Sequence, residues 1–127
     1  MNFICNTGGR ELYYKGTKEP DCVPRAIATA TQTDYKQVWE ELCDIARPLG
    51  FFPNNKKVYQ IYLINRGWVN VKLPKPFPQI QTLKLKQAIV YCKAGYGTHL
   101  TVILNGSLND TWDCRDRLAY SYWEAAE

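Results

Sequence analysis

The sequence has 127 residues, of which 46% are hydrophobic and 13% aromatic, and its formal net charge at neutral pH is +4. These values describe one globular domain over residues 1–127 with a hydrophobic core, and they exclude a disordered chain. The basic residues are scattered along the chain, so the small positive charge indicates an ordinary solvated surface and argues against nucleic-acid binding.

The stretch MNFICNTGGR lacks the basic start and apolar run of a signal peptide, and no stretch is long and apolar enough to span a membrane. We therefore expect a cytoplasmic monomer without membrane association, in a compartment that keeps thiols reduced. There are five cysteines without C-x-x-C spacing and a single histidine, His99. This set predicts neither a disulfide framework nor a metal site, and we expect no cofactor.

The first half of the chain is predicted to be helical. Residues 1–20 are rich in glycine and predict loops, with one short strand at 12–14. Asp21 is a favourable N-cap residue and Pro24 suits a first turn, so a helix is predicted from Asp21 to about Thr31. A second helix begins at residue 33 or 34 and ends near 48–50, with Cys43 in its core-facing part. A third helix covers 55–66.

The second half has the pattern of an antiparallel sheet, in which short strand-like segments are separated by turn residues. A strand at 68–71 and a proline-rich connector come first, and four short segments rich in β-branched and aromatic residues follow: QAIVYCK, HLTVIL, SLNDTWD and LAYSYW. Cys92 lies inside the first of these four segments and is expected to be packed in the core. The sequence therefore predicts an α+β fold, in which N-terminal helices pack on a C-terminal antiparallel sheet.

Asn105 and Gly106 form the strongest turn signal, because both residues tolerate the positive φ that a type I′ hairpin needs. With these two residues as the loop, His99 faces Trp112 across the hairpin. Asp110 then lies on the same face as His99, diagonally opposite it, where a long side chain can reach. The hairpin therefore predicts a histidine–carboxylate pair.

Cys22 lies at the predicted start of the first helix, where unpaired N–H groups and a partial positive charge favour a thiolate. A thiol at a helix start, a histidine on a strand and a carboxylate beside that histidine are the three components of a nucleophilic site. We therefore expect Cys22, His99 and Asp110 to form a catalytic Cys-His-Asp triad.

The segments DCVPRAIATATQTDYKQVWEEL, GTHLTVILNGSLNDTWDCRD and YSYW resemble a group of small phage and prophage proteins. That group is similar to a minimal papain-like cysteine peptidase fold, and the resemblance covers residues 19–123. It implies a papain-like fold with Cys22 as the nucleophile, His99 as the base and Asp110 as the orienting acid.

The sequence departs from the papain-like pattern at the oxyanion site. Papain-like peptidases carry a glutamine about six residues before the cysteine, where this chain has Gly16, with Thr17 and Lys18 nearby. The backbone N–H of Cys22 is the first expected oxyanion donor, and the second is unassigned. A further three residues are taken as candidate support for the site: Asp21, Thr17 and Trp112.

Three neighbouring residues leave alternatives open. Trp112 either covers the histidine–carboxylate pair or is a plain cross-strand aromatic residue. Cys114 falls on the His99 face and is a rival thiol, although a strand end lacks the field of a helix start. Arg25 binds a substrate carboxylate or forms an ion pair with Glu19, and we expect the ion pair.

The expected function is that of a thiol hydrolase, a peptidase or amidase that forms an acyl-enzyme intermediate on a protein or peptide substrate. The alternative is a catalytically silent phage-encoded protein on the same scaffold that binds a host protein. A structural phage component that self-assembles is a third possibility. For a phage-encoded protein, the expected location is the cytoplasm of the host bacterium.

Overall fold

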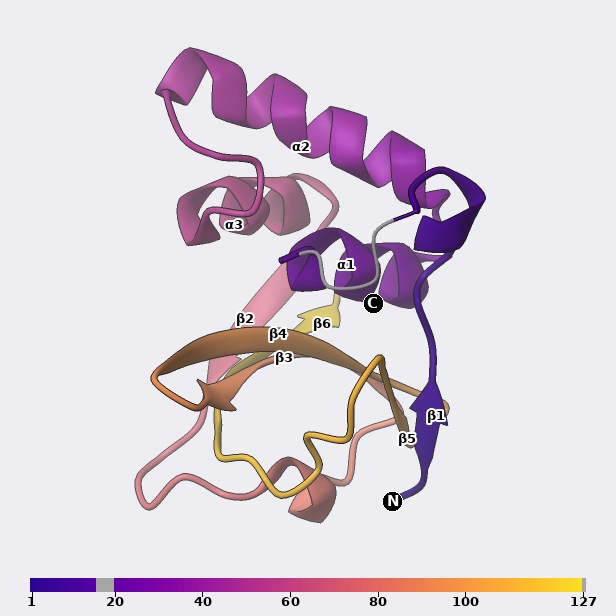
Figure 1. Ribbon diagram of the computed structural model, residues 1–127. Coiled ribbons are helices and arrows are strands. Elements are labelled where there is room, and N and C mark those ends of the chain that lie inside the picture. The colour runs from indigo at the N-terminus through magenta and orange to yellow at the C-terminus, as the bar shows by residue number, and fades with distance from the viewer. Residues whose placement is uncertain (16–19, 127) are drawn as a thin grey trace.

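The computed structural model describes residues 1–15 and 20–126, which form three α-helices and a six-stranded mixed sheet (Figure 1). The fold is therefore α+β. The helices are α1 (Cys22–Thr31), α2 (Tyr35–Leu49) and α3 (Lys56–Asn65). The strands are β1 (Phe3–Cys5), β2 (Trp68–Lys72), β3 (Gln87–Ala94), β4 (Gly97–Leu104), β5 (Ser107–Asp110) and β6 (Ala119–Ala125). Their order in the sheet is β1-β5-β4-β3-β6-β2.

Helices α2 and α3 begin where local capping chemistry predicts. The Asp34 side chain accepts a hydrogen bond from the Gln37 backbone at the start of α2, and Gly50 ends that helix with a left-handed conformation. Asn55 caps α3 in the same way. Cys43 is half-exposed, so its predicted place in the core is wrong. The buried stripe of α2 passes to one side of it through Leu42 and its helical neighbours.

The predicted loop-and-strand arrangement of the N-terminal segment is wrong in two respects. A 3-10 turn forms at Arg10–Leu12 in place of the expected strand at 12–14. The segment's strand is β1, which pairs in parallel with β5 and makes the sheet mixed where a purely antiparallel sheet was expected. A strand of three residues is too short to show a period of two, and its partner β5 defines it.

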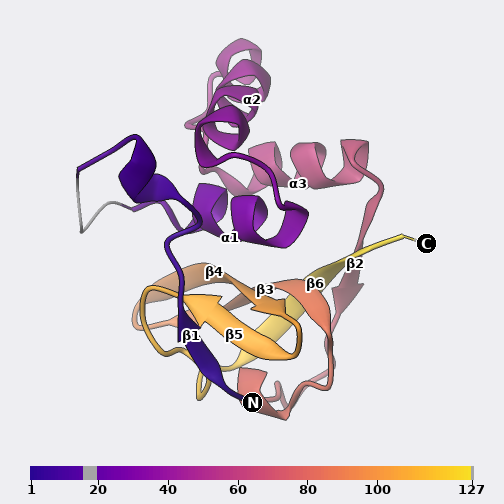
Figure 2. The same cartoon turned by 90° about the vertical axis from the view of Figure 1, so that its right-hand side faces the viewer.

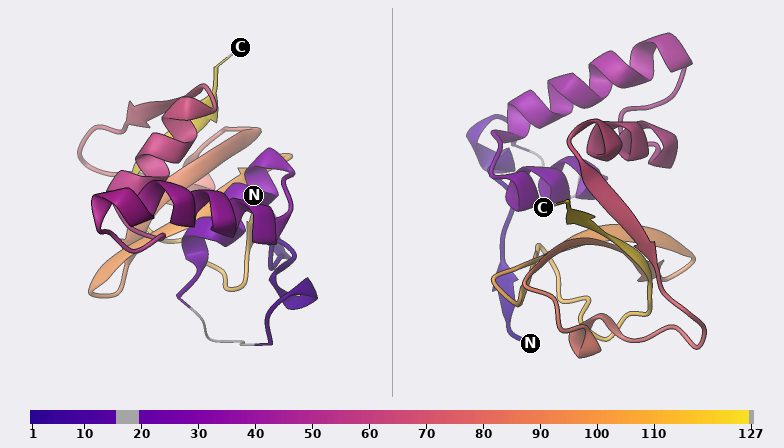
Figure 3. Two further views of the ribbon diagram at one scale, coloured as in Figure 1. Left: turned by 90° about the horizontal axis from the view of Figure 1, so that it is seen from above. Right: turned by 180° about the vertical axis from the view of Figure 1, so that it is seen from behind.

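The sheet has a core on each face. The three helices cover one face, while the connector between β2 and β3 crosses the other with its 3-10 turn Ile80–Thr82 (Figures 2 and 3). On the helical face, small residues such as Ala26 and Ala30 let α1 approach β4 closely. On the opposite face, Ile80 and Cys92 are fully buried, which confirms that Cys92 is packed.

The hairpin between β4 and β5 has the predicted register. Asn105 and Gly106 have φ values of 53° and 75°, and Leu104 pairs with Ser107. However, β5 ends at Asp110, so the predicted strand through residue 113 is too long and Trp112 is not a ladder partner of His99. The ladder between β4 and β5 starts at Val102, which leaves the preceding edge of β4 to the first turn of α1.

Among the residues that the structure describes, none of the helices combines the length and apolar character needed to cross a membrane.

Candidate active site

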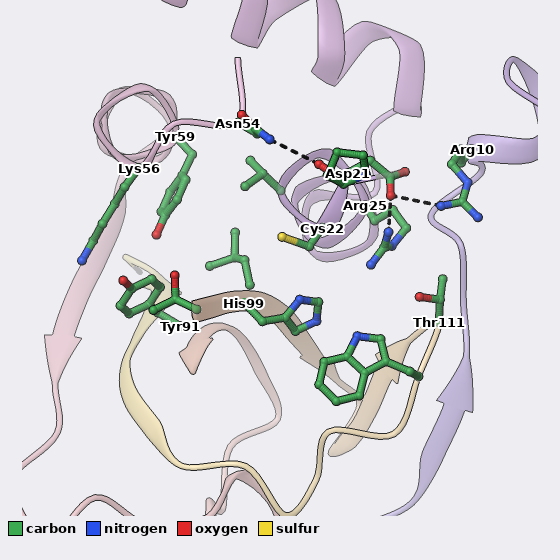
Figure 4. Close-up of a pocket in the computed structure, with 15 residues that line it drawn as sticks. Arg10, Asp21, Cys22, Arg25, Asn54, Lys56, Tyr59, Tyr91, His99 and Thr111 are labelled. Atoms are coloured by element: carbon green, nitrogen blue, oxygen red, sulfur yellow. Dashed lines mark hydrogen bonds and ion pairs between the residues drawn. The ribbon is translucent and has the colours of Figure 1, made fainter. Parts of the chain in front are cut away.

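Cys22 is the first residue of α1 and is half-buried beside the free edge of β4. Its sulfur faces a cavity that His99 also lines (Figure 4). The His99 side chain and the backbone N–H of Leu100, both on β4, lie close enough to the thiol to lower its pKa. The early divergence of β5 is what makes that backbone N–H available, because no β5 residue pairs with Leu100.

The thiol of Cys22 is more acidic than an ordinary cysteine. Burial, the largest single influence, would raise the pKa of Cys22, whereas hydrogen bonding to His99 and to the Leu100 backbone lowers it. The positive charges of His99 and Arg25 act in the same direction, so the pKa is lowered overall. Cys22 therefore has the environment of a nucleophilic thiolate.

His99 and Asp110 form a buried ion pair. His99 Nε2 lies 2.6 Å from Asp110 Oδ2, and both side chains are at most 8% exposed. Nε2 bonds Asp110, so Nδ1 is the ring nitrogen left for the thiol. The Trp112 ring contacts the imidazole, with 5.0 Å between ring centroids. Trp112 therefore covers this pair although it lies outside the strand ladder.

The histidine and the aspartate stabilise each other's charged forms. Burial opposes the imidazolium and is the largest single influence, but the hydrogen bond to Asp110, together with Cys114, Cys22 and the charge of Asp110, outweighs it and raises the pKa of His99 to about 11. Burial likewise opposes the carboxylate, but hydrogen bonding to His99 and its positive charge lower the pKa of Asp110. At neutral pH these shifts favour a thiolate beside an imidazolium.

Arg25 links the helix start to the triad. Its guanidinium bonds the Asp21 carboxylate, and its Nη2 lies 3.3 Å from Asp110 Oδ1. Arg10 Nη1 lies 3.0 Å from Asp21 Oδ1, and the Tyr35 hydroxyl donates to Asp21 Oδ2 at 2.8 Å. Arg25 is thus held by two buried carboxylates. Its expected partner, Glu19, lies outside the described residues.

These contacts leave the first turn of α1 uncapped by Asp21. Asp21 is the N-cap residue as predicted, but its side chain makes no capping hydrogen bond, because the two arginines and Tyr35 hold it away from the turn. Pro24 has no N–H to satisfy. Among the described residues, no acceptor caps the backbone N–H groups of Cys22 and Val23, so they remain for an anion that forms next to the sulfur.

Cys114 lies behind the triad, on the side away from the cavity. It is fully buried, and its sulfur lies 3.8 Å from Asp110 Oδ2. Hydrogen bonding to Cys92 is the largest influence on it and lowers the pKa of Cys114 to about 6. Within the described residues, Cys22 is the one cysteine that lines the cavity, so Cys114 has no access to a substrate there.

His99, Asp110 and Cys114 place ligand-type atoms within 4.8 Å of one another, which is the spacing of a metal site. A zinc ion with ligands at about 2.0–2.3 Å needs its ligand atoms more than 3 Å apart. The 2.6 Å separation of His99 Nε2 and Asp110 Oδ2 is too close for an ion between them. The contact between His99 and Asp110 is therefore a direct hydrogen bond and not a shared coordination of an ion.

The cavity in front of Cys22 has a volume of about 530 Å³, a size that suits a small ligand or a short peptide segment. Lys56 and Tyr59 of α3, Tyr91 of β3 and Asn54 also line it, and sequence reasoning missed all four. They come from separate elements and share no spacing motif. Thr17, a predicted supporting residue, lies outside the described residues.

No family model matches the sequence, and no curated protein or solved structure shows a detectable match to it. The fold and the site therefore define the class: an α+β protein with a cysteine–histidine–aspartate cluster at the wall of an open cavity.

Proposed function

We propose that this protein is a papain-like thiol hydrolase, a peptidase or amidase that uses Cys22, His99 and Asp110. The observation that carries the proposal is an acidified thiol at a helix start beside an imidazole that a buried carboxylate holds at 2.6 Å. The chain order of cysteine, histidine and acid, with the cysteine on a helix and the other two on a sheet, is the order expected of the papain-like group.

In the first step, the Cys22 thiolate attacks the carbonyl carbon of the substrate. A C–S bond forms while the carbonyl oxygen becomes an oxyanion. The uncapped N–H groups at the start of α1 stabilise that oxyanion, an interaction for which loss of one donor costs about 100- to 1000-fold in rate. His99 then gives its proton to the departing nitrogen, the C–N bond breaks and a thioester remains.

In the second step, neutral His99 takes a proton from water, whose oxygen attacks the thioester carbon. The C–S bond breaks, the acid product leaves, and the thiolate and imidazolium are restored. Asp110 keeps its negative charge throughout and holds the ring in place through Nε2.

The test is hydrolysis of a panel of fluorogenic peptide amides, with the acyl-enzyme trapped by acid quench and detected by intact mass. We expect Cys22→Ser and His99→Ala each to lower kcat/KM by at least about a thousandfold. Cys43→Ser, on the far part of α2, should leave kcat/KM unchanged.

Turnover that persists in Cys22→Ser would overturn the proposal. A wild-type protein that neither cleaves the panel nor forms an acyl adduct would favour the catalytically silent binding protein on the same scaffold.

A further inference from the structure

We propose that Lys56, Tyr59 and Tyr91 form a subsite for a carboxylate of the substrate, so that the protein prefers an acidic residue or a chain terminus close to the scissile bond. This inference rests on the proposed hydrolase and names its substrate class. The three residues line the same cavity as Cys22 and His99. They gather at the end where α3 meets β3 (Figure 4).

The Tyr59 hydroxyl is a buried hydrogen-bond donor without an acceptor among the described residues. Its side chain is 3% exposed, and the hydroxyl has no hydrogen-bond partner within the described part of the chain. In Figure 4 the ring extends from α3 toward Tyr91, along the cavity wall. Burial raises the pKa of Tyr59, so the hydroxyl keeps its proton and can donate it. A buried donor of this kind is costly unless an acceptor arrives.

Lys56 brings a positive charge to the same place. It begins α3, one helical turn before Tyr59, so the two side chains lie on one face of the helix. Its Nζ lies 4.0 Å from the centroid of the Tyr91 ring, a cation–π contact that holds the ammonium over the cavity end. An ammonium and a hydroxyl donor on the wall of one cavity fit a carboxylate.

The two arginines that line the cavity are already paired with carboxylates. Arg10 and Arg25 are bound to Asp21, and Arg25 also to Asp110. Lys56 forms no ion pair with any residue that the structure describes. Asp21 is the one acidic residue on the described cavity wall, and its two arginines hold its charge. The uncompensated positive charge of the cavity therefore lies at Lys56.

The test compares matched peptide substrates that carry Glu, Gln or Lys at each position flanking the scissile bond. We expect Glu to be favoured over Gln by about tenfold to a hundredfold in kcat/KM at one position, which is the worth of a charge-assisted hydrogen bond. Lys56→Ala should bring this ratio near one, and Lys56→Glu should make the Lys peptide the preferred substrate over the Glu peptide. The control is Lys57→Glu, which makes the same charge change on the adjacent residue, whose side chain lies over Phe51.

Tyr59→Phe should lower kcat/KM for the Glu peptide, while the melting temperature stays equal or rises because an unsatisfied hydroxyl has been removed. A fall in melting temperature with unchanged selectivity would assign Tyr59 a packing role and overturn its part in the subsite. Equal kcat/KM for Glu and Gln at every position in an active wild-type enzyme would overturn the subsite as a whole.

A measurement without turnover separates this inference from the hydrolase proposal. The ratio of Cys22 alkylation rates by iodoacetate and iodoacetamide should fall several-fold in Lys56→Glu and stay constant in Lys57→Glu, because the anionic reagent senses the cation. If this ratio changes as expected in a protein without turnover, the subsite stands and the hydrolase proposal fails. A ratio that Lys56→Glu leaves unchanged counts against the subsite.

Discussion

The charged groups of the site survive burial because each one has an opposite charge in contact. Asp110 holds His99 on one side and Arg25 on the other, and Arg25 in turn holds Asp21. A buried carboxylate or imidazolium without such a partner would lose its charge. The lowered pKa of Cys22 thus depends on a series of buried groups of alternating charge: His99, Asp110, Arg25 and Asp21.

The first prediction concerns the rate at which iodoacetamide alkylates Cys22 between pH 5 and 10. Because its pKa is lowered, the rate should rise and level off below the pH range of about 8.5 where free thiols ionise. In His99→Ala, burial remains while the strongest compensating bond is lost, so the pKa should move above the ordinary value. We expect at least a tenfold slower reaction at pH 7.

Peptide mass mapping gives the rate for each cysteine, and Cys43 is the internal control because burial, the largest influence, raises its pKa. A Cys22 rate that rises together with the Cys43 rate would contradict an ion-paired thiolate.

The position of α1 depends on a close backbone approach by the N-terminal segment. Gly8 has a φ of +68°, and a Cβ built on it would lie 2.9 Å from the backbone oxygen of Arg25 in the first turns of α1. That contact fits glycine alone, since neither backbone can yield like a flexible side chain. The loop after β1 therefore holds the helix that carries the nucleophile.

We accordingly predict that Gly8→Ala destabilises the protein by about 2–4 kcal/mol, the sum of a positive φ and an overpacked contact. Gly67→Ala is the matched control: it has a φ of +82° but nothing within 4 Å of a built Cβ, so its cost should be about 1–2 kcal/mol. Urea unfolding measures both values. Equal losses in the free energy of unfolding would show that the close contact between Gly8 and the Arg25 backbone does not contribute to the cost.

The elements that could be predicted from sequence are those with local signals. Asp34, Gly50 and Asn55 marked helix ends, and Asn105 with Gly106 fixed the register that brings Asp110 to His99. No such signal marks β1, whose three residues become a strand through pairing with β5. The contacts of Lys56, Tyr59 and Arg25 were also inaccessible, because they depend on the docking of helices onto the sheet.

At the scale of the whole molecule, the site lies where the helical layer meets the sheet, with the thiol on one layer and the histidine and aspartate on the other. The charge chain through Arg25 crosses this boundary. Folding stability and site chemistry therefore depend on the same buried charges, and pH should affect both together.

The prediction at this scale is the pH dependence of the cost of Asp110→Asn. The folded-state pKa of Asp110 is lowered, so its contribution is present above the unfolded value of about 3.9 and is lost as pH falls through the folded pKa. At pH 7 the substitution should cost about 3–5 kcal/mol, because it leaves His99 and Arg25 without their carboxylate. In urea unfolding from pH 7 to pH 2, this difference should shrink toward zero.

The contribution of His99 to folding stability changes with pH in the opposite direction. Its raised pKa means that its contribution is complete below about 6.5 and declines as pH rises toward 11. A cost of Asp110→Asn that is as large at pH 2 as at pH 7 would contradict the charged pair.

The early end of β5 has a consequence for the behaviour of the protein at high concentration. An incomplete strand edge is where a second molecule ordinarily adds a strand and aggregation begins. Here the first turn of α1 occupies the edge of β4 at His99 and Leu100. The same turn that supplies the nucleophile therefore also shields this edge from strand addition.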